Sequence, residues 1–206
     1  MKLAILGASG HGEVVADAAE LLGFEISFYD DSYPSKSRVG VWIVNGTSKD
    51  LVKDQSKFNG AIVAIGDNQV RKSKIEYLKE KGLTLQTLIH PSSIVSRRAN
   101  VKSGTVILAG SVVNSSAYIG EGCIINSNAT IEHDCVIREF SHISPSVAIA
   151  GGAKISASVW VGIGSCTKQL IEIGDNSIIG AGSNVLKNIE PNVLAYGNPA
   201  KKIKEL

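Results

Sequence analysis

The second half of the chain is organised by a six-residue repeat. From residue 89 to residue 185, 16 of the 17 positions spaced six apart are Ile or Val, and only Thr167 departs. The fourth residue after each aliphatic position is mostly small, as at Ser93, Ala99, Thr105, Ser111, Ala117, Cys123, Ala129, Cys135 and Ser141. A unit with one large and one small inward side chain predicts a short strand and a turn. Stacked units of this kind form a parallel β-solenoid with coils about 4.8 Å apart.

The first 88 residues follow a different pattern. Aliphatic runs alternate with segments in which apolar residues recur at helical spacing. The expected strands are 3–8, 25–31 and 61–68, and the expected helices are 13–23 and 69–82. Strands that alternate with helices predict a small parallel sheet with helical crossovers, an α/β, Rossmann-like arrangement. We therefore predict two domains, residues 1–88 (α/β) and residues 89–206 (all-β).

Composition restricts the classes of partner. The chain has 21 basic and 19 acidic residues, so no charge excess points to a nucleic acid or a membrane surface. Three cysteines without CxxC spacing indicate neither a disulfide framework nor a zinc site. No apolar stretch approaches the roughly 20 residues of a membrane span. We expect a cytoplasmic protein without bound metal, and with partners that are small molecules.

A glycine-rich segment, GASGHG, follows the first expected strand and opens the first helix. Glycines allow a tight turn and close approach of a ligand, and a helix N-terminus offers free N–H groups to phosphate. Gly10, His11 and Gly12 are therefore candidates for binding a nucleotide diphosphate. The spacing does not match G-x-G-x-x-G, so a purely structural turn is the alternative.

Polar residues also follow the second and third strands. Asp30 and Asp31 end the second strand about 20 residues beyond the glycines, where dinucleotide-binding folds place an acid for the ribose. Gly66, Asn68 and Arg71 follow the third strand, at the edge of the sheet where such folds bind ligands. The alternatives are a solvated turn for the aspartates and a surface helix charge for Arg71.

The repeat itself carries one candidate general base. His133 is third in its hexapeptide, near a corner from which side chains project outward, and Asp134 follows it. A carboxylate holds a histidine in one tautomer and makes it a better base, although a plain surface histidine is the alternative. His142 ends its hexapeptide and is expected either at a neighbouring subunit's cleft or as an exposed corner residue. Cys135 occupies the small inward position, which argues against a nucleophilic thiol.

The pattern [LIV]-G-x-x-[small]-x and the closing segment AYGNPAKKIK (195–204) resemble the hexapeptide-repeat acyltransferases. This resemblance implies a left-handed β-helix with three hexapeptides per coil, a homotrimer, and an acyl donor bound in clefts between subunits. The left hand is implied by the resemblance alone, because ordinary crossover rules favour the right.

GASGHG, IGDNxxR, LIHPSSIVS and IEHDCVIREFSHIS together resemble the bacterial nucleotide-sugar acetyltransferases of the PglD/NeuD type over essentially the whole chain. The resemblance is closest to enzymes that transfer acetyl from acetyl-CoA to the 4-amino group of a UDP-4-amino-4,6-dideoxy-sugar for surface glycans. It implies His133 as general base with Asp134 as its partner. It also implies acetyl-CoA contacts at His142, Gly151, Ile163 and Ala181, an acceptor contact at Asn126, and UDP-sugar contacts at His11, Asp30 and Asp31.

Three other functions remain open from the sequence. A sialic acid O-acetyltransferase would use the same architecture on a hydroxyl group. A γ-type carbonic anhydrase would need three histidine ligands. The chain has four histidines, but His11 sits in the glycine loop and His90 lies before the coils of the β-helix begin, which argues against such a site. A non-catalytic nucleotide-sugar-binding trimer would not need the His133–Asp134 pair. The tail lysines Lys201, Lys202 and Lys204 are expected to be solvated rather than bound to the phosphates of CoA.

Overall fold

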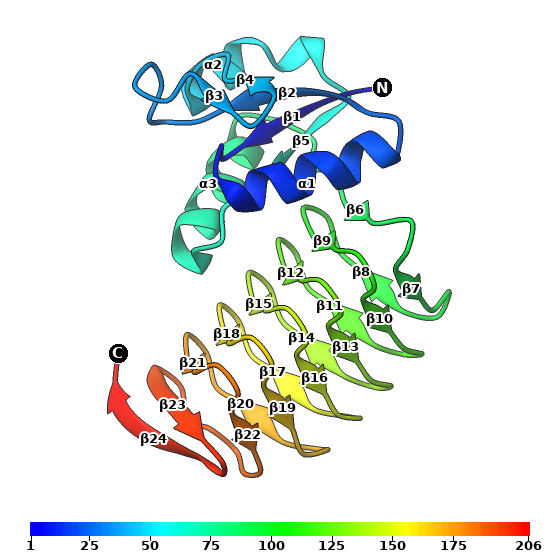
Figure 1. Cartoon of the computed structure of the whole chain (residues 1–206), viewed down its shortest axis with the longest axis vertical. Helices are drawn as coiled ribbons and strands as arrows, with labels where there is room; N and C mark the ends of the chain where they lie inside the picture. Colours follow the sequence, from blue (N-terminus) through cyan, green and yellow to red (C-terminus); the bar gives the residue numbers. More distant parts are fainter. The chain divides into compact units, whose positions relative to one another are not determined.

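The computed structural model describes residues 1–206 and divides into two compact units, Met1–Pro91 and Ser92–Leu206. Figure 1 shows an α/β unit and a stack of short strands wound into coils. These are the two architectures that the sequence predicted. None of the helices combines the length and apolar character needed to cross a bilayer.

The first unit is built on a parallel sheet with strand order β2-β1-β5. Its strands are β1 (Lys2–Leu6), β2 (Glu25–Tyr29) and β5 (Gly60–Val63), with the hairpin β3 (Arg38–Val39) and β4 (Trp42–Ile43). Its helices are α1 (Gly10–Leu21), α2 (Ser48–Lys53) and α3 (Asn68–Glu80), with a 3-10 turn at Gln55–Lys57 and a short strand β6 (Leu88–Ile89). Helix α1 packs on β1 and β2, and α3 packs on β5.

Local sequence explains these elements. Strand β1 is an aliphatic run with Leu3 to Leu6 buried, as expected of a parallel strand covered on both faces. The N-terminus of α3 is capped by Asp67, whose side chain accepts a 2.8 Å hydrogen bond from the N–H of Val70. Thr47 and Asp50 form a capping box at the start of α2. Helix α1 begins at Gly10, three residues earlier than expected, so the second half of GASGHG is helical.

The second unit is a parallel β-helix with three faces. The first face contains β7 (Ile94–Val95), β10 (Val112–Val113), β13 (Thr130–Ile131), β16 (Ala148–Ile149), β19 (Cys166–Thr167) and β22 (Asn184–Val185). The second contains β8 (Asn100–Val101), β11 (Tyr118–Ile119), β14 (Val136–Ile137), β17 (Lys154–Ile155) and β20 (Glu172–Ile173). The third contains β9 (Val106–Ile107), β12 (Ile124–Ile125), β15 (His142–Ile143), β18 (Trp160–Val161), β21 (Ile178–Ile179), β23 (Val193–Gly197) and β24 (Ala200–Glu205).

Each coil contains three hexapeptides, as the resemblance implied. Ile131 pairs with Val113 on one side and with Ile149 on the other, so each strand meets its equivalents one full coil before and after it. These aliphatic side chains are at most 1% exposed and form a continuous column. The expected small positions lie inside the coil as well. Ser111 and Ser141, for example, donate hydrogen bonds to carbonyl groups 15 residues further along, at Asn126 and Ser156.

One residue of each hexapeptide turns the corner of the coil with a left-handed backbone. From residue 104 to 182 every sixth residue has positive φ: Gly104, Gly110, Ser116, Gly122, Asn128, Asp134, Phe140, Ser146, Gly152, Ser158, Gly164, Leu170, Asn176 and Gly182. Glycine, Asn and Asp tolerate this conformation best. Phe140 and Leu170 are bulky exceptions; Phe140 is buried, whereas Leu170 is 76% exposed. Strained residues concentrate at functional sites, and Leu170 is the one of the two that faces solvent.

The aliphatic column predicts how stability is distributed over the β-helix. Replacement of Ile143 (fully buried) with Ala should lower the free energy of unfolding by about 2–5 kcal/mol, because a cavity forms in a close-packed column. The matched change Ile94→Ala, at a side chain that is 69% exposed, should cost less than about 0.5 kcal/mol. Denaturant unfolding followed by circular dichroism measures both. Equal losses would contradict the assignment of the column as the core.

Candidate active site

The carboxyl ends of the three parallel strands of the first unit bring the predicted nucleotide-binding residues to one edge of the sheet. Strand β1 leads into GASGHG, β2 leads into Asp30 and Asp31, and β5 leads into the segment that contains Gly66, Asn68 and Arg71. Ligands of open α/β sheets bind outside this edge. The edge therefore contains every residue that the sequence predicted for the nucleotide-sugar in this unit.

The glycines of the loop have different structural roles. Gly7 has φ +116°, and a Cβ atom there would lie 2.7 Å from the carbonyl oxygen of Ala64. A Cβ at Gly12 would lie 2.3 Å from the carbonyl oxygen of Gly7, so Gly12 allows the helix to pack against the loop. A Cβ at Gly10 would meet nothing within 4 Å. Of the predicted glycines, Gly12 is thus required by the fold, whereas Gly10 leaves open space beside the start of α1.

Asp30 ties the glycine loop to the end of β2. Its carboxylate accepts hydrogen bonds from the N–H groups of Ala8 (2.7 Å) and Ser32 (2.9 Å). Burial raises the pKa of Asp30, but these two donors, together with the Ser32 side chain and the charge of Lys36, hold the pKa below its ordinary value. The alternative of a plain solvated turn is therefore wrong for Asp30, because its carboxylate is part of the loop architecture.

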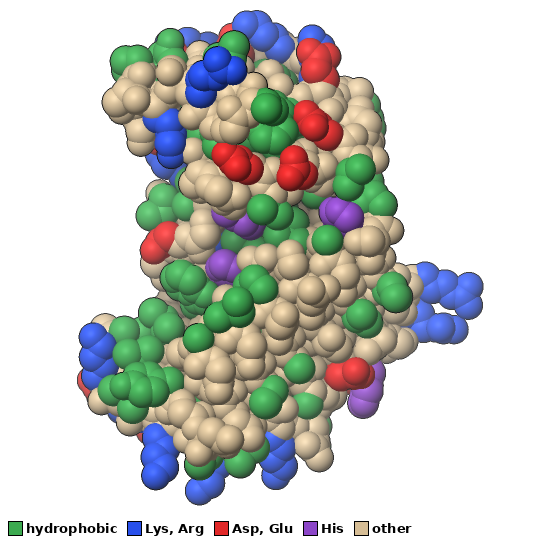
Figure 2. Space-filling model, viewed as in Figure 1, with side chains coloured by type: hydrophobic (Ala, Val, Ile, Leu, Met, Phe, Trp, Pro, Cys, Tyr) green, Lys and Arg blue, Asp and Glu red, His purple; other side chains and the backbone are tan.

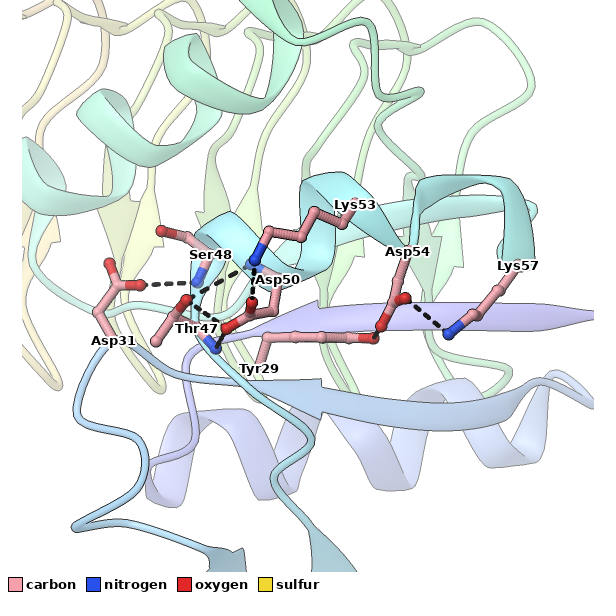
Figure 3. A network of polar contacts seen from close by, with 8 residues as sticks. All are labelled: Tyr29, Asp31, Thr47, Ser48, Asp50, Lys53, Asp54 and Lys57. Atoms are coloured by element: carbon pink, nitrogen blue, oxygen red, sulfur yellow. Dashed lines mark hydrogen bonds and ion pairs between the residues drawn. The ribbon is translucent and has the colours of Figure 1, made fainter.

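Asp31 lies at a cavity of about 380 Å³ lined by Asp31, Thr47, Ser48, Lys49, Lys74 and Tyr77. Its carboxylate accepts a 2.7 Å hydrogen bond from the N–H of Ser48 and forms an ion pair with Lys74. Burial opposes ionisation, but these contacts leave the pKa of Asp31 lowered. Figure 3 shows Asp31 turned toward Ser48 at the start of α2, beside the Thr47–Asp50 capping box. A second cluster in the same view joins Tyr29 to Asp54 and Lys57.

Arg71 is buried, so its interpretation as a surface helix charge is wrong. The side chain is 1% exposed and donates hydrogen bonds to the carbonyl oxygens of Ile65 and Gly66 (both 3.0 Å). It also donates to Asn68 Oδ1 at 2.7 Å. Burial, together with the positive charge of Arg71, lowers the pKa of His11 to about 4. His11 is consequently neutral at pH 7 and can act there only as a neutral hydrogen-bonding group.

In the β-helix, His133 and Asp134 form the pair that the sequence predicted. His133 Nδ1 and Asp134 Oδ2 are 2.8 Å apart, and both side chains are about two-thirds exposed. Asp134 has φ 60°, the corner conformation of the repeat, which Asp adopts more readily than most residues. The hydrogen bond to Asp134 raises the pKa of His133. With its Nδ1–H directed to the carboxylate, the neutral ring has its lone pair on Nε2.

Gly151 lies against the ring of His133. A Cβ atom at Gly151 would be 2.7 Å from His133 Nε2, so any side chain there would displace the imidazole. The next residue, Gly152, donates its N–H to the carbonyl oxygen of His133 at 2.9 Å. His133, Asp134, Gly151, Gly152, Gln169 and Leu170 line a cavity of about 420 Å³. This cavity therefore places the exposed imidazole of His133 beside main chain that carries no side chain at Gly151 and Gly152.

His142 belongs to a separate groove of about 470 Å³. The groove is largely apolar and is lined by residues that include His142, Pro145, Trp160, Ile163, Ile178 and Ala181. It therefore brings together three of the four residues predicted for acetyl-CoA, while Gly151 lies in the cavity of His133. His142 is 7% exposed, so the alternative of an exposed corner residue is wrong. The groove and the His133 cavity share no lining residue.

Asn126 lies beside His142 rather than beside His133. Asn126 Nδ2 is 3.2 Å from His142 Nε2, and the ring of His142 stacks on Trp160 with centroids 5.4 Å apart. Cys135, in contrast, is fully buried, and its Sγ lies 3.2 Å from the carbonyl oxygen of Ala150. Burial raises the pKa of this thiol, which removes Cys135 as a nucleophile.

Several residues that line these cavities were not predicted from the sequence. Trp160 lies one coil after His142, and Leu170 lies one coil after Gly152, so the period of the repeat points to both. Lys74 has no such signal, because its pairing with Asp31 depends on the tertiary fold. No three His, Cys, Asp or Glu side chains gather in an arrangement that could hold a metal ion.

Comparison with known proteins identifies the family. Residues 2–78 match the model of the PglD N-terminal domain. The acetyltransferase domain of PglB from Neisseria gonorrhoeae FA1090 is 36% identical, with a TM-score of 0.93, over 98% of this chain and 99% of that chain. The same domain has also been solved with acetyl coenzyme A. A histidine-to-asparagine variant of perosamine N-acetyltransferase from Caulobacter crescentus, in complex with CoA and GDP-perosamine, is 30% identical with a TM-score of 0.94, over 100% of this chain and 98% of that chain.

Curated relatives match over shorter segments. UDP-N-acetylbacillosamine N-acetyltransferase of Bacillus subtilis strain 168 is 35% identical over 111 residues, which is 52% of this chain and 51% of that protein. Galactoside O-acetyltransferase of Escherichia coli K12 is 49% identical over 47 residues, 23% of each chain. The chain thus spans from about a quarter to about half of these relatives' length. With the solved structures, these matches show that the chain belongs to the PglD-type family of nucleotide-sugar N-acetyltransferases, whose β-helix is that of the hexapeptide acyltransferases. The prediction of an acyltransferase is confirmed.

The His133–Asp134 pair predicts a measurable electrostatic effect. In Asp134→Asn the pKa of His133 should fall toward the ordinary value of about 6.5, because the amide cannot stabilise the imidazolium. The neutral ring, the form able to accept a proton, would then persist to lower pH than in the wild type. Titration of the His133 ring by NMR measures this, and Asn tolerates the left-handed backbone at position 134.

Glu132→Gln is the matched control. Glu132 acts on His133 only through its charge, as the last of the contributions to its pKa, so the pKa should fall less than in Asp134→Asn. Equal shifts in the two variants, or no shift in Asp134→Asn, would contradict the pairing.

Proposed function

We propose that the chain transfers the acetyl group of acetyl-CoA to the 4-amino group of a UDP-4-amino-4,6-dideoxy-sugar, with His133 as general base. The observation that carries this proposal is the 2.8 Å contact between His133 and Asp134, in a cavity where the ring lies against Gly151. Membership of the nucleotide-sugar N-acetyltransferase family supports the reaction type.

The first step is attack of the sugar's C4 amine on the thioester carbonyl carbon. As the C–N bond forms, the amine loses a proton to Nε2 of His133, the ring nitrogen that is not bonded to Asp134. The carboxylate of Asp134 stabilises the imidazolium that results, in agreement with the raised pKa of His133. Only the neutral ring can start this step, so activity should decline as the pH falls through that raised pKa.

The second step is collapse of the tetrahedral intermediate. The oxyanion re-forms the carbonyl group and the C–S bond breaks. The CoA thiolate takes up the proton that the imidazolium of His133 releases, which returns the ring to its neutral form. Backbone N–H groups are effective donors to such an oxyanion. The N–H of Gly152 already donates to the main-chain carbonyl oxygen of His133. We therefore assign the neighbouring N–H, that of Gly151, to the oxyanion. The acetyl group passes directly to the amine, without a covalent enzyme intermediate.

The two substrates are assigned to different parts of the chain. The apolar groove with His142, Ile163 and Ala181 suits the pantetheine arm of acetyl-CoA, because such grooves bury an extended chain with few polar contacts. For the nucleotide we assign the carboxyl edge of the sheet, with Gly10, His11, Gly12, Asp30, Asp31, Gly66, Asn68 and Arg71. The open space at Gly10 allows a phosphate close to the start of α1. Arg71 and Asp30 hold the loops of this edge in place.

A homotrimer is part of the proposal. The His133 cavity and the His142 groove are two incomplete sites on one chain, and packing of identical β-helices would set one against the other. Trp160, Ile163 and Leu170 are exposed apolar side chains along these two surfaces. Over the coils, the face seen in Figure 2 consists mainly of backbone and uncharged side chains, which favours close contact between copies.

The proposal is tested by a panel of acceptors with release of CoA as the readout. The panel contains UDP-4-amino-4,6-dideoxy-sugars, GDP-perosamine, CMP-sialic acid and free sialic acid. We expect turnover with a UDP-4-amino-sugar, and a loss of about 10²–10⁴-fold in kcat/KM for His133→Ala because the general base is removed. Lys154→Ala is the control. Lys154 belongs to an exposed ion pair on the surface, so this variant should keep wild-type turnover.

Binding of the nucleotide-sugar and the oligomeric mass should be unchanged in His133→Ala, because the side chain is about two-thirds exposed and its hydrogen bond is to the adjacent residue Asp134. Wild-type turnover by His133→Ala would remove the histidine from the mechanism. Turnover with sialic acid alone would show that the chain is an O-acetyltransferase. Turnover with GDP-perosamine alone would show that the acceptor carries a guanosine rather than a uridine nucleotide.

A further inference from the structure

Asn126 makes contacts that the acceptor-binding role does not require. It follows β12, whose Ile124 pairs with His142 of β15 in the next coil. Its Nδ2 lies 3.2 Å from His142 Nε2, and its Oδ1 accepts a 2.8 Å hydrogen bond from the N–H of Ser127. Both ends of the amide are therefore engaged with the protein.

These contacts determine which way the amide faces. The N–H of Ser127 needs an acceptor, so the oxygen of Asn126 must lie on that side. The NH₂ end then faces His142, and an amide NH₂ can only donate. His142 Nε2 must accept that hydrogen bond through its lone pair, which places the proton of the neutral ring on Nδ1.

The surroundings of His142 keep the ring in one orientation. The ring stacks on Trp160 with an angle of 10° between planes, and Trp160 Nε1 donates to Ser144 Oγ at 2.9 Å. A doubly protonated His142 would direct an N–H at the NH₂ of Asn126, so that two donors would face each other in a nearly buried place. The neutral form is the one that this arrangement favours.

We propose that Asn126 is a positioning residue of the acyl-donor groove, which keeps His142 neutral and protonated on Nδ1. His142 then lines the groove as an uncharged ring and takes no part in proton removal. The inference rests on the proposed function for its donor, acetyl-CoA. The two histidines are thereby divided in role, since Nε2 of His133 receives a proton and Nε2 of His142 is occupied by Asn126.

The tautomer is tested by ¹⁵N NMR of the histidine rings. The chain has only four histidines, so His→Gln variants assign every ring. In the wild type His142 should have an unprotonated Nε2 and a protonated Nδ1 across neutral pH. In Asn126→Asp a carboxylate replaces the donor, so Nε2 should become protonated. A role confined to packing would leave the tautomer unchanged.

Steady-state kinetics tests the consequence for the donor. Asn126→Asp and Asn126→Ala should lower kcat/KM for acetyl-CoA roughly tenfold, the effect of one hydrogen bond, and leave KM for the nucleotide-sugar unchanged. Asn114 holds the same hexapeptide place on another face of the β-helix, so Asn114→Asp should alter neither the tautomer nor the kinetics.

Two results would overturn the inference. One is a protonated Nε2 on His142 in the wild type, or a tautomer that does not respond to Asn126→Asp. The other is an increase in KM for the nucleotide-sugar in the Asn126 variants, with kcat/KM for acetyl-CoA unchanged. That result would assign Asn126 to binding of the acceptor sugar. Failure of the proposed function is distinguishable, because a wild type without turnover on any acceptor still reports its His142 tautomer by NMR.

Discussion

The pairing of each coil with the next, always in the same register, is the constraint on which the active-site half of the molecule depends. Parallel hydrogen bonding places Val113, Ile131 and Ile149 in one column and repeats this on every face. The same register stacks the corners, so that Asp134, Gly152 and Leu170 follow one another along one edge. A functional side chain on this scaffold is thus positioned by the coils before and after it, through main-chain contacts that hardly depend on side-chain identity.

Chemistry enters where the repeat departs from its ordinary residues. At one corner, Asp134 adopts the left-handed conformation and meets His133, while Gly151 leaves room for the imidazole. On another face, His142 occupies a strand position and is held between Trp160 and Asn126. Neither set forms a complete two-substrate site by itself. In our proposal the base of one subunit meets the donor groove of its neighbour, and the α/β unit supplies the nucleotide-sugar.

The period of the repeat made the β-helix and its inward columns predictable, because a six-residue pattern allows few other structures. The His133–Asp134 pair was predictable for the same reason, since an outward histidine next to an acid stands out against small and aliphatic residues. The partners of Asn126 and the burial of Arg71 were not. Asn126 Nδ2 meets a ring 16 residues away on the next coil, and Arg71 satisfies carbonyl groups of a loop whose path depends on the tertiary fold. Asp31 and Lys74, 43 residues apart, meet only once the sheet and α3 have formed.

Complementation between two defective chains tests the central claim, a site shared by neighbouring copies, most directly. One chain carries His133→Ala, and the other carries Ile163→Trp, which fills the donor groove at a side chain that is 55% exposed. Mixed trimers contain interfaces where an intact base meets an intact groove, and random mixing should restore roughly a quarter of the wild-type activity. Activity no higher than that of the two parents, in trimers shown to contain both chains, would contradict the shared site.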